Sequence, residues 1–350
     1  MKTERVILSG NDKLMLMSNM STMLQAGIPI LEIVDSLLDD SKGGSRKVFE
    51  VMKDDLNQGH HVYTSLEKFP RVFDKVTVNI IRASEEAGTL DVVLNDVKEN
   101  IKKDMEFSDK VRSALMYPIF IVFVFIAVLV MILVVVVPKI STVFMRLDVE
   151  LPLPTVIMIT LSQWITTYTI PIIIGIVLLA VGTAYLYKMQ KQLFLNVLFA
   201  LPLVSELAKQ IDLTRFTHSL YLLLNAGIPI TSALELSVST VKKREIAHAI
   251  KRALEVVSAG KRLSEGFKES KHVFPSIMIK ITEAGEKTGS LEKSMADTSE
   301  FLDYQVSKTL KTLTALLEPI MLVAVGVLIG GMMLAIIAPI YNLIGQVGNR

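Results

Sequence analysis

The 350-residue sequence contains no cysteine, and this absence excludes disulfide bonds, thiolate zinc sites and cysteine nucleophiles together. Charge is also scarce: charged residues make up 21%, and 37 basic side chains nearly balance 35 acidic ones. A net charge this small gives no reason to expect a polyanionic partner, so we predict no nucleic-acid binding. Apolar residues instead make up 51% and raise the mean hydropathy to +0.48. This composition favours a membrane protein.

The sequence lacks the local motifs of common active sites. The five histidines form no i, i+4 pair and no HExxH motif, so we expect solvated side chains rather than metal ligands. The glycine-rich segment 285–290 does not have P-loop spacing, and no GxSxG elbow is present. Glu85 and Glu86 point about 100° apart on a helix, which favours a surface role, an intersubunit contact or incidental cation binding over acid-base catalysis. We therefore predict that the protein is not an enzyme and that it has no catalytic, cofactor-binding or metal-binding residue.

Three apolar runs are long enough to cross a bilayer: residues 118–137, 170–187 and 319–340. The stretch 155–168 is apolar on one face only, and we expect an interfacial helix there with Trp164 and Tyr168 at headgroup depth. The first dozen residues have no apolar core of the kind that a signal peptide needs. Eight Lys or Arg residues flank the runs on the N-terminal side of the membrane and three flank them on the other side. This bias predicts a cytoplasmic N-terminus and an external C-terminus.

The chain contains an internal repeat. LQAGIPI at residues 24–30 recurs as LNAGIPI at 224–230, an offset of 200. Later matches have an offset of 201, and they are Glu85 with Glu286, Gly88 with Gly289, Pro118 with Pro319, and Pro138 with Pro339. Each unit, 13–138 and 214–339, therefore has a polar part of about 100 residues, a common domain size, followed by a crossing. The run at 170–187 has no counterpart and returns the second copy to the same face of the membrane as the first.

Each copy has a first helix-to-helix corner marked by glycine and proline. Gly27 and Gly227 can end a helix in the left-handed conformation. Pro29 and Pro229 then begin the next helix with φ already set.

A second corner follows in each copy. Gly88 and Gly289 end a helix, Thr89 or Ser290 caps the next one, and an acidic residue lies in its first turn. The helices that follow, from 90 to about 112 and from 291 to about 314, run toward the apolar segments and could act as levers.

The resulting fold class is an all-α membrane protein with two repeated cytoplasmic helical-bundle domains and three transmembrane helices. The expected order is a first cytoplasmic helical domain (1–112), transmembrane helix 1 (113–138), an external loop with an interfacial helix (139–169), transmembrane helix 2 (170–188), a second cytoplasmic helical domain (189–314), transmembrane helix 3 (315–341) and an external tail (342–350).

A few positions near the apolar runs are candidates for packing or contact. Glu318, just before Pro319, is either a headgroup-level side chain or a contact with a basic group of a membrane partner. Gly326 and Gly330 form a GxxxG pair, which favours packing in an oligomer or against a partner helix, with packing inside the chain as the alternative. The methionines near the start, Met17, Met20 and Met23 with Met15 nearby, fit an ordinary helical core.

The duplicated LxAGIPI and Glu-x-x-Gly-x-Leu corners, each followed by a proline-headed apolar helix, resemble the inner-membrane platform proteins of type IV pilus and type II secretion machines, the PilC/GspF family. The resemblance covers residues 13 to 342. Gly27, Pro29, Gly227 and Pro229 match the family's first corner, and Gly285, Glu286 and Gly289 match its Gly-Glu-x-x-Gly pattern. Two departures are Ser84, which replaces the leading glycine in the first copy, and the segment 215–217, which has no equivalent before Gly27.

The resemblance implies six-helix cytoplasmic bundles and a non-enzymatic role in the bacterial inner membrane, without a cofactor. The implied role links a cytoplasmic hexameric assembly ATPase to the insertion of pilin or pseudopilin subunits, alongside other inner-membrane components and as a homo-oligomer. A membrane transporter and a helical signalling scaffold are the alternatives. The first is disfavoured because the repeats face the same side and the apolar runs carry no charge.

Overall fold

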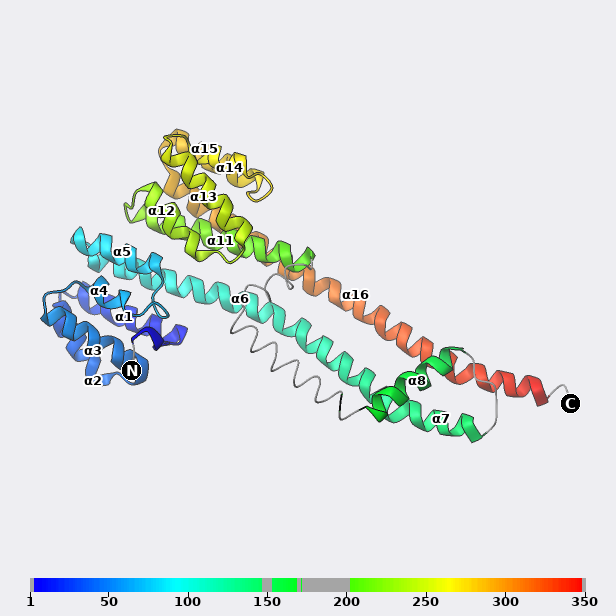
Figure 1. Cartoon of the computed structure of the whole chain (residues 1–350). Helices are drawn as coiled ribbons and strands as arrows, with labels where there is room; N and C mark the ends of the chain where they lie inside the picture. Colours follow the sequence, from blue (N-terminus) through cyan, green and yellow to red (C-terminus); the bar gives the residue numbers. More distant parts are fainter. Residues whose placement is uncertain (1–2, 147–152, 169–170, 172–201, 348–350) are drawn as a thin grey trace. The chain divides into compact units, whose positions relative to one another are not determined.

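The computed structural model describes residues 3–146, 153–168, 171 and 202–347, and these residues form helices and no strands (Figure 1). They separate into two compact units. One unit combines Met1–Lys110 with Glu206–Ser307, and the other combines Val111–Ser205 with Lys308–Arg350. The expected second crossing, 170–188, lies outside the described residues except for Pro171.

The described part of each copy follows the same order of helices. In the first copy they are α1 (Gly10–Gln25), α2 (Ile30–Asp40), α3 (Gly43–Asn57), α4 (Val62–Glu67), α5 (Lys75–Glu86) and α6 (Leu90–Met131). Then come a π-helical turn, η2 (Ile132–Val136), α7 (Val137–Arg146) and α8 (Leu153–Thr167). The second copy has α11 (Pro202–Asn225), α12 (Ile230–Ser237), α13 (Arg244–Ser258), α14 (Leu263–Glu269), α15 (Ser276–Thr288) and α16 (Leu291–Val347).

The first bundle closes around the apolar face of α1. Met17 and Met20 are fully buried, and Met23 packs against the same core. Met15, however, is 61% exposed, so the prediction that it belongs with this core is wrong. It lies two residues, or about 200°, from Met17 and therefore on the opposite face of the helix.

The second bundle has an aromatic core. Phe216 of α11, Phe267 of α14 and Phe274 are fully buried, with ring centroids 4.3 to 6.2 Å apart. Phe216 belongs to the segment 215–217, which has no sequence equivalent before Gly27. Its neighbour Thr217 is buried too and donates to the Leu213 carbonyl. Two of the three residues in this departure are thus core residues.

One surface ion pair occurs in both copies with its charges exchanged. In the first copy Arg82 of α5 lies 3.5 Å from Glu67 of α4. At the equivalent positions of the second copy, Lys268 of α14 lies 2.9 Å from Glu283 of α15. The two bundles therefore keep the contact between these helices while reversing its polarity.

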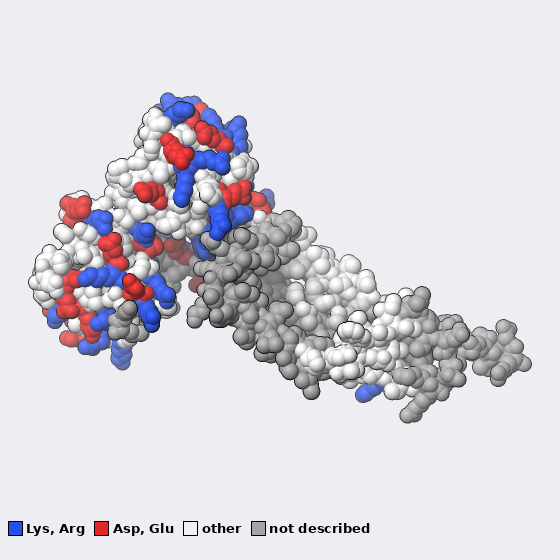
Figure 2. All heavy atoms as spheres, viewed as in Figure 1, with Lys and Arg blue, Asp and Glu red and all other residues white. Residues whose placement is uncertain are grey.

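Two described helical segments are long and apolar enough to cross a membrane, Leu90–Lys139 and Leu291–Gly331. Their most apolar stretches are almost entirely exposed, with 6% and 0% of residues buried. In Figure 2, the part of the unit Val111–Ser205 with Lys308–Arg350 that is coloured by residue type is accordingly nearly all uncharged. Such surfaces are stable when lipid or another apolar surface covers them.

Candidate functional site

The first corner is a helix stop enforced by backbone conformation. Gly27 and Gly227 have φ of +81° and +76°, and nothing lies within 4 Å of a Cβ built on either one. The positive φ, rather than a lack of space, therefore calls for glycine. The next residue folds back: Ile28 N donates to Met23 O at 3.1 Å, and Ile228 N donates to Leu223 O at 3.0 Å.

Pro29 and Pro229 lie one position earlier than the expected first helical residue. Both occupy the N-cap, with ψ of 141°, and the helices begin at Ile30 and Ile230. The extended ψ shows that each proline directs the chain into the helix from outside it.

At the second corner, the glutamate of each copy holds the start of a short helix. Glu85 Oε1 accepts from Val62 N at 2.9 Å and its Oε2 accepts from Tyr63 N at 3.2 Å. Glu286 Oε1 accepts from Ser264 N, also at 3.2 Å. A carboxylate at the amide end of α4 or α14 satisfies donors that the helix leaves unpaired. The glutamate at this position thus holds α5 against α4 in the first copy and α15 against α14 in the second.

Gly88 and Gly289 then end α5 and α15 with φ of +72° and +70°. Thr89 and Ser290 precede the first residues of α6 and α16, but their hydroxyls make other bonds. Thr89 Oγ1 donates to Ser84 O at 3.5 Å, and Ser290 Oγ lies 2.7 Å from Thr288 Oγ1.

The departure at Ser84 reflects different packing in the two copies. A Cβ at the equivalent Gly285 would lie 2.0 Å from Ser294 Oγ, so α15 and α16 approach each other too closely for a side chain there. In the first copy Ser84 is buried, and its hydroxyl donates to Ile81 O at 2.8 Å. The second corner thus tolerates a side chain at this position in the first copy and excludes one in the second copy.

Beyond the second corner, α6 and α16 continue without a break into the apolar segments. Pro118 lies inside α6, and Glu318 and Pro319 are exposed on α16. A Cβ built on Gly326 or Gly330 meets nothing within 4 Å in the described part of the chain. The structure therefore does not gather these positions into one site.

A π-helical turn interrupts the first apolar segment near its end. Val137 N donates to Ile132 O, five residues back instead of four. The Leu133 carbonyl loses its usual donor to this shift, and Pro138 has no N–H to replace it. Ser162 of α8 supplies the bond instead, with its Oγ donating to Leu133 O at 2.6 Å in a buried contact.

Apolar contacts extend the same junction, since Ile159 of α8 packs against Leu133 and Val137. The stretch expected at the interface is thus helical and packs on the first apolar segment, while Trp164 is 67% exposed.

Sequence reasoning missed a charged cleft between the copies. Lys110 of α6 donates to Asp303 of α16 at 2.9 Å. A cavity of about 580 Å³ lies beside this pair, between α6, α11 and α16. Its charged and histidine lining consists of Lys103, Asp104, Glu106, Lys110, Arg215, His218, Asp297, Glu300 and Asp303. Arg215 belongs to the departure at 215–217, but the other positions lie outside the repeated motifs and the comparison of the two copies gave no signal for them.

The prediction of solvated histidines is wrong for His218. Its Nε2 is buried and has no hydrogen-bond partner among the described residues. Burial lowers the pKa of His218, and the nearby Asp104 carboxylate opposes that shift. The other histidines have exposed side chains.

Known proteins resemble this chain along almost its whole length. It is 28% identical over 341 residues to the type IV pilus assembly protein PilC of Myxococcus xanthus, covering 97% of this chain and 82% of the relative. It is 26% identical over 346 residues to the type II secretion system protein F of Pseudomonas aeruginosa, covering 97% and 85%. PilC of P. aeruginosa is 27% identical, with 94% and 89% covered.

The family described as type II secretion system protein F matches this chain twice, at residues 16–138 and 216–339. The two matches begin 200 residues apart and end 201 apart, which confirms the repeat and its one-residue shift. The two matched domains end at Pro138 and Pro339, the prolines at the ends of the apolar segments. The chain therefore belongs to the type II secretion system protein F family, which is the PilC/GspF family that its sequence resembles.

Proposed function

We propose that this protein is the inner-membrane platform of a type IV pilus or type II secretion system, and that it transmits movement of its cytoplasmic bundles to the insertion of pilin or pseudopilin subunits. The observation that carries the proposal is the continuity of α6 and α16. In both copies, one helix leaves the glutamate-held corner and runs into an apolar segment. An uninterrupted helix is a stiff link, so it can pass on a displacement that a flexible loop would absorb.

The proposed topology has three crossings, with both bundles and the N-terminus in the cytoplasm and the C-terminus outside. Only an even number of crossings between the copies returns the second bundle to the side of the first. The apolar run at 170–187 supplies the second of these crossings. The distribution of Lys and Arg around the runs supports this orientation.

The proposed partners are a cytoplasmic hexameric assembly ATPase, pilin-like subunits and other inner-membrane components of the same machine. The printed names of the relatives support this setting, since they are pilus-assembly and secretion-system proteins. The role is mechanical and non-enzymatic, and the protein acts as a homo-oligomer.

The test is to interrupt the link in α6. Inserting Gly-Gly-Ser after Ser113 should abolish surface filaments or secretion in the native host, because glycine makes the helix flexible at that point. Inserting seven alanines there should preserve most activity, since seven residues are close to two helical turns. Membrane fractionation must show both variants at normal levels. Full activity of the glycine variant would contradict the proposal.

A further inference from the structure

Corresponding helices of the two copies carry opposite charge. The segment from α2 through α3, residues 30–57, has seven acidic and four basic side chains, a net charge of −3. The equivalent segment from α12 through α13, residues 230–258, has three acidic and five basic side chains, a net charge of +2. Asp55 is the one buried charged residue of the two segments, so nearly all of this difference lies on their surfaces.

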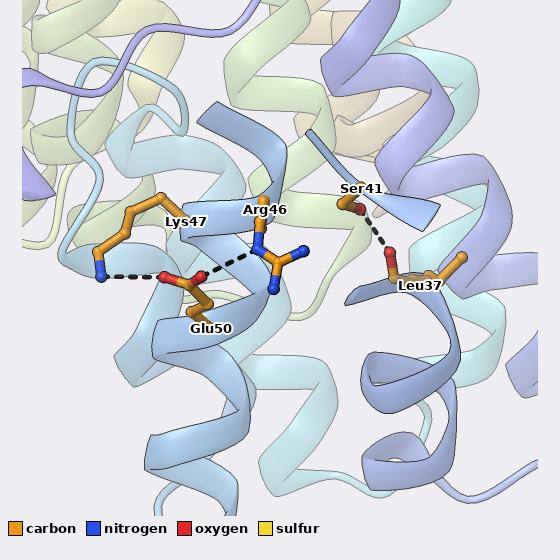
Figure 3. Close-up of polar contacts among 5 residues, drawn as sticks. All are labelled: Leu37, Ser41, Arg46, Lys47 and Glu50. Carbon is orange, nitrogen blue, oxygen red and sulfur yellow. Dashed lines mark hydrogen bonds and ion pairs between the residues drawn. The ribbon is translucent and has the colours of Figure 1, made fainter. Parts of the chain in front are cut away.

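In the first copy, the cations of this segment are largely neutralised. Glu50 lies between Arg46 and Lys47, at 3.2 and 3.1 Å (Figure 3). Hydrogen bonds from Lys47 and Arg46 lower the pKa of Glu50. Lys53 pairs with Asp35 at 2.8 Å.

These pairs leave an excess of carboxylates on the same surface. Glu32, Asp39, Asp40 and Asp54 are exposed and have no ion-pair partner within 4 Å among the described residues. Asp35 raises the pKa of Lys53, and the charges of Asp39 and Asp54 add to this shift. Asp39 and Asp54 therefore both lie near Lys53, on one patch. We call these four residues the acidic face.

In the second copy, the residue that corresponds to Glu50 carries the opposite charge. The position of Glu50 is occupied by Lys251, and Arg252 follows it. Both are exposed on α13, on the side away from the buried Ile246 and Ile250. Lys261 and Arg262, between α13 and α14, are exposed as well. These four cations have no ion-pair partner in the described part of the chain, and we call them the basic face.

Both faces belong to the same compact unit and both are exposed there, so neither one neutralises the other inside a single chain. A second copy of this chain offers the opposite charge to each face. A membrane fits the basic face less well, because no large apolar side chain of α13 is exposed and Glu245 and Glu255 interrupt its positive surface. Figure 2 shows this mixture of signs over the bundles.

We propose that the basic face of the second bundle binds the acidic face of the first bundle of a neighbouring copy. Because the two faces differ, the contact is of the head-to-tail kind, which builds closed rings when the rotation between subunits allows it. Electrostatic complementarity of this type fixes the register between partners and rejects wrong pairings.

Charge reversal of the full-length protein in detergent tests this pairing. K251E/R252E and D39K/D40K should each weaken self-association by about tenfold, as judged from the mass distribution over a dilution series. Combining all four changes in one chain should restore the association to near the wild-type value, because the complementarity returns with its signs exchanged. Raising the salt from about 0.1 M to about 1 M shortens the Debye length from about 10 Å to about 3 Å and should weaken the wild-type association.

The matched control is K271E/K280E, which makes the same change of charge on exposed lysines of the second copy outside the basic face. It should leave self-association unchanged, and thermal unfolding should show that all variants are folded. Failure of the fourfold variant to recover, or equal weakening by the control, would overturn the proposal. A further outcome would also overturn it: the K251E/R252E variant no longer binds anionic vesicles but self-associates as the wild type does. That result would assign the basic face to the membrane. These measurements use the isolated protein, so their outcome is independent of the proposed role in filament assembly.

Discussion

Glu85 shows how one side chain can define a corner. Its two oxygens accept from consecutive backbone amides of α4, and its side chain is only 15% exposed. The sequence marked this residue through the repeat with Glu286, but not its partners, which lie 22 and 23 residues earlier. Periodicity identifies which residues share a helix face, whereas contacts between helices depend on how the bundle closes.

Replacing Glu85 with alanine should remove both bonds and destabilise the first bundle by about 1–2 kcal/mol. Glu286→Ala should cost less, because Glu286 makes one such bond. Hydrogen–deuterium exchange of the full-length protein should show faster exchange at Val62 and Tyr63 in the first variant and at Ser264 in the second. Equal, unchanged exchange at all three amides would contradict this assignment.

Glu283 gives a pH-dependent prediction. Hydrogen bonds from Lys268 and Lys287 lower its pKa from 4.5 to about 2. Its ion pairs therefore contribute stability above pH 4.5, and this contribution is lost as the pH falls toward about 2. The melting temperature of wild type should approach that of Glu283→Gln over that window, while the difference persists at neutral pH. A constant difference across the window would rule out this role.

The polarity of the same contact can be exchanged. Glu283→Arg alone should destabilise the second bundle, because it brings three cations together. The triple variant K268E/E283R/K287E places the charges of Glu67, Arg82 and Glu86 at the equivalent positions and should recover the wild-type melting temperature. A triple variant that melts no higher than the single one would contradict the prediction that the charges of this contact can be exchanged.

At the scale of elements, the sequence predicted the helices, their corners and the long helices that leave them. Left-handed glycines and prolines act locally, so short motifs were sufficient to place the stops. The π-helical turn was not predicted, because it depends on two features far apart in the chain. The turn takes the Val137 N–H away from Leu133 O, and Pro138 has no N–H to replace it. Ser162, 29 residues later than Leu133, supplies a hydroxyl instead.

Ser162→Ala should destabilise the junction of α8 with the first apolar segment by about 1–3 kcal/mol, because it leaves a buried carbonyl unpaired. Ser162→Thr keeps a hydroxyl and should retain most of the stability. Thr160→Ala is the control, since its hydroxyl bonds within its own helix and is exposed. Unfolding of the full-length protein in detergent provides the measurement, and equal effects of the two alanine variants would refute the special role of Ser162.

At the scale of the whole molecule, the repeat was readable from the sequence, but the charged cleft between the copies was not. Lys110 and Asp303 lie 193 residues apart. Only the closing of the two bundles into one unit brings them together, and neither residue belongs to a repeated motif.

The absence of cysteine makes the proposed topology directly testable. His60→Cys and Lys261→Cys occupy equivalent exposed positions in the two bundles, and each would be the single thiol of the chain. A membrane-impermeant maleimide should label neither in intact spheroplasts and both after permeabilisation, because both bundles are proposed to be cytoplasmic. Thr142→Cys, beyond the first apolar segment, should be labelled from outside. Labelling of one bundle residue but not the other in intact spheroplasts would refute the topology.

The π-helical turn has a geometric consequence for the duplication itself. One additional residue in a turn rotates everything after it by about 100° around the helix axis. The second copy passes its equivalent positions as regular α-helix. The backbones of the two copies therefore lose at this turn the angular register that they share before it, although their sequences still align residue for residue up to Pro138 and Pro339.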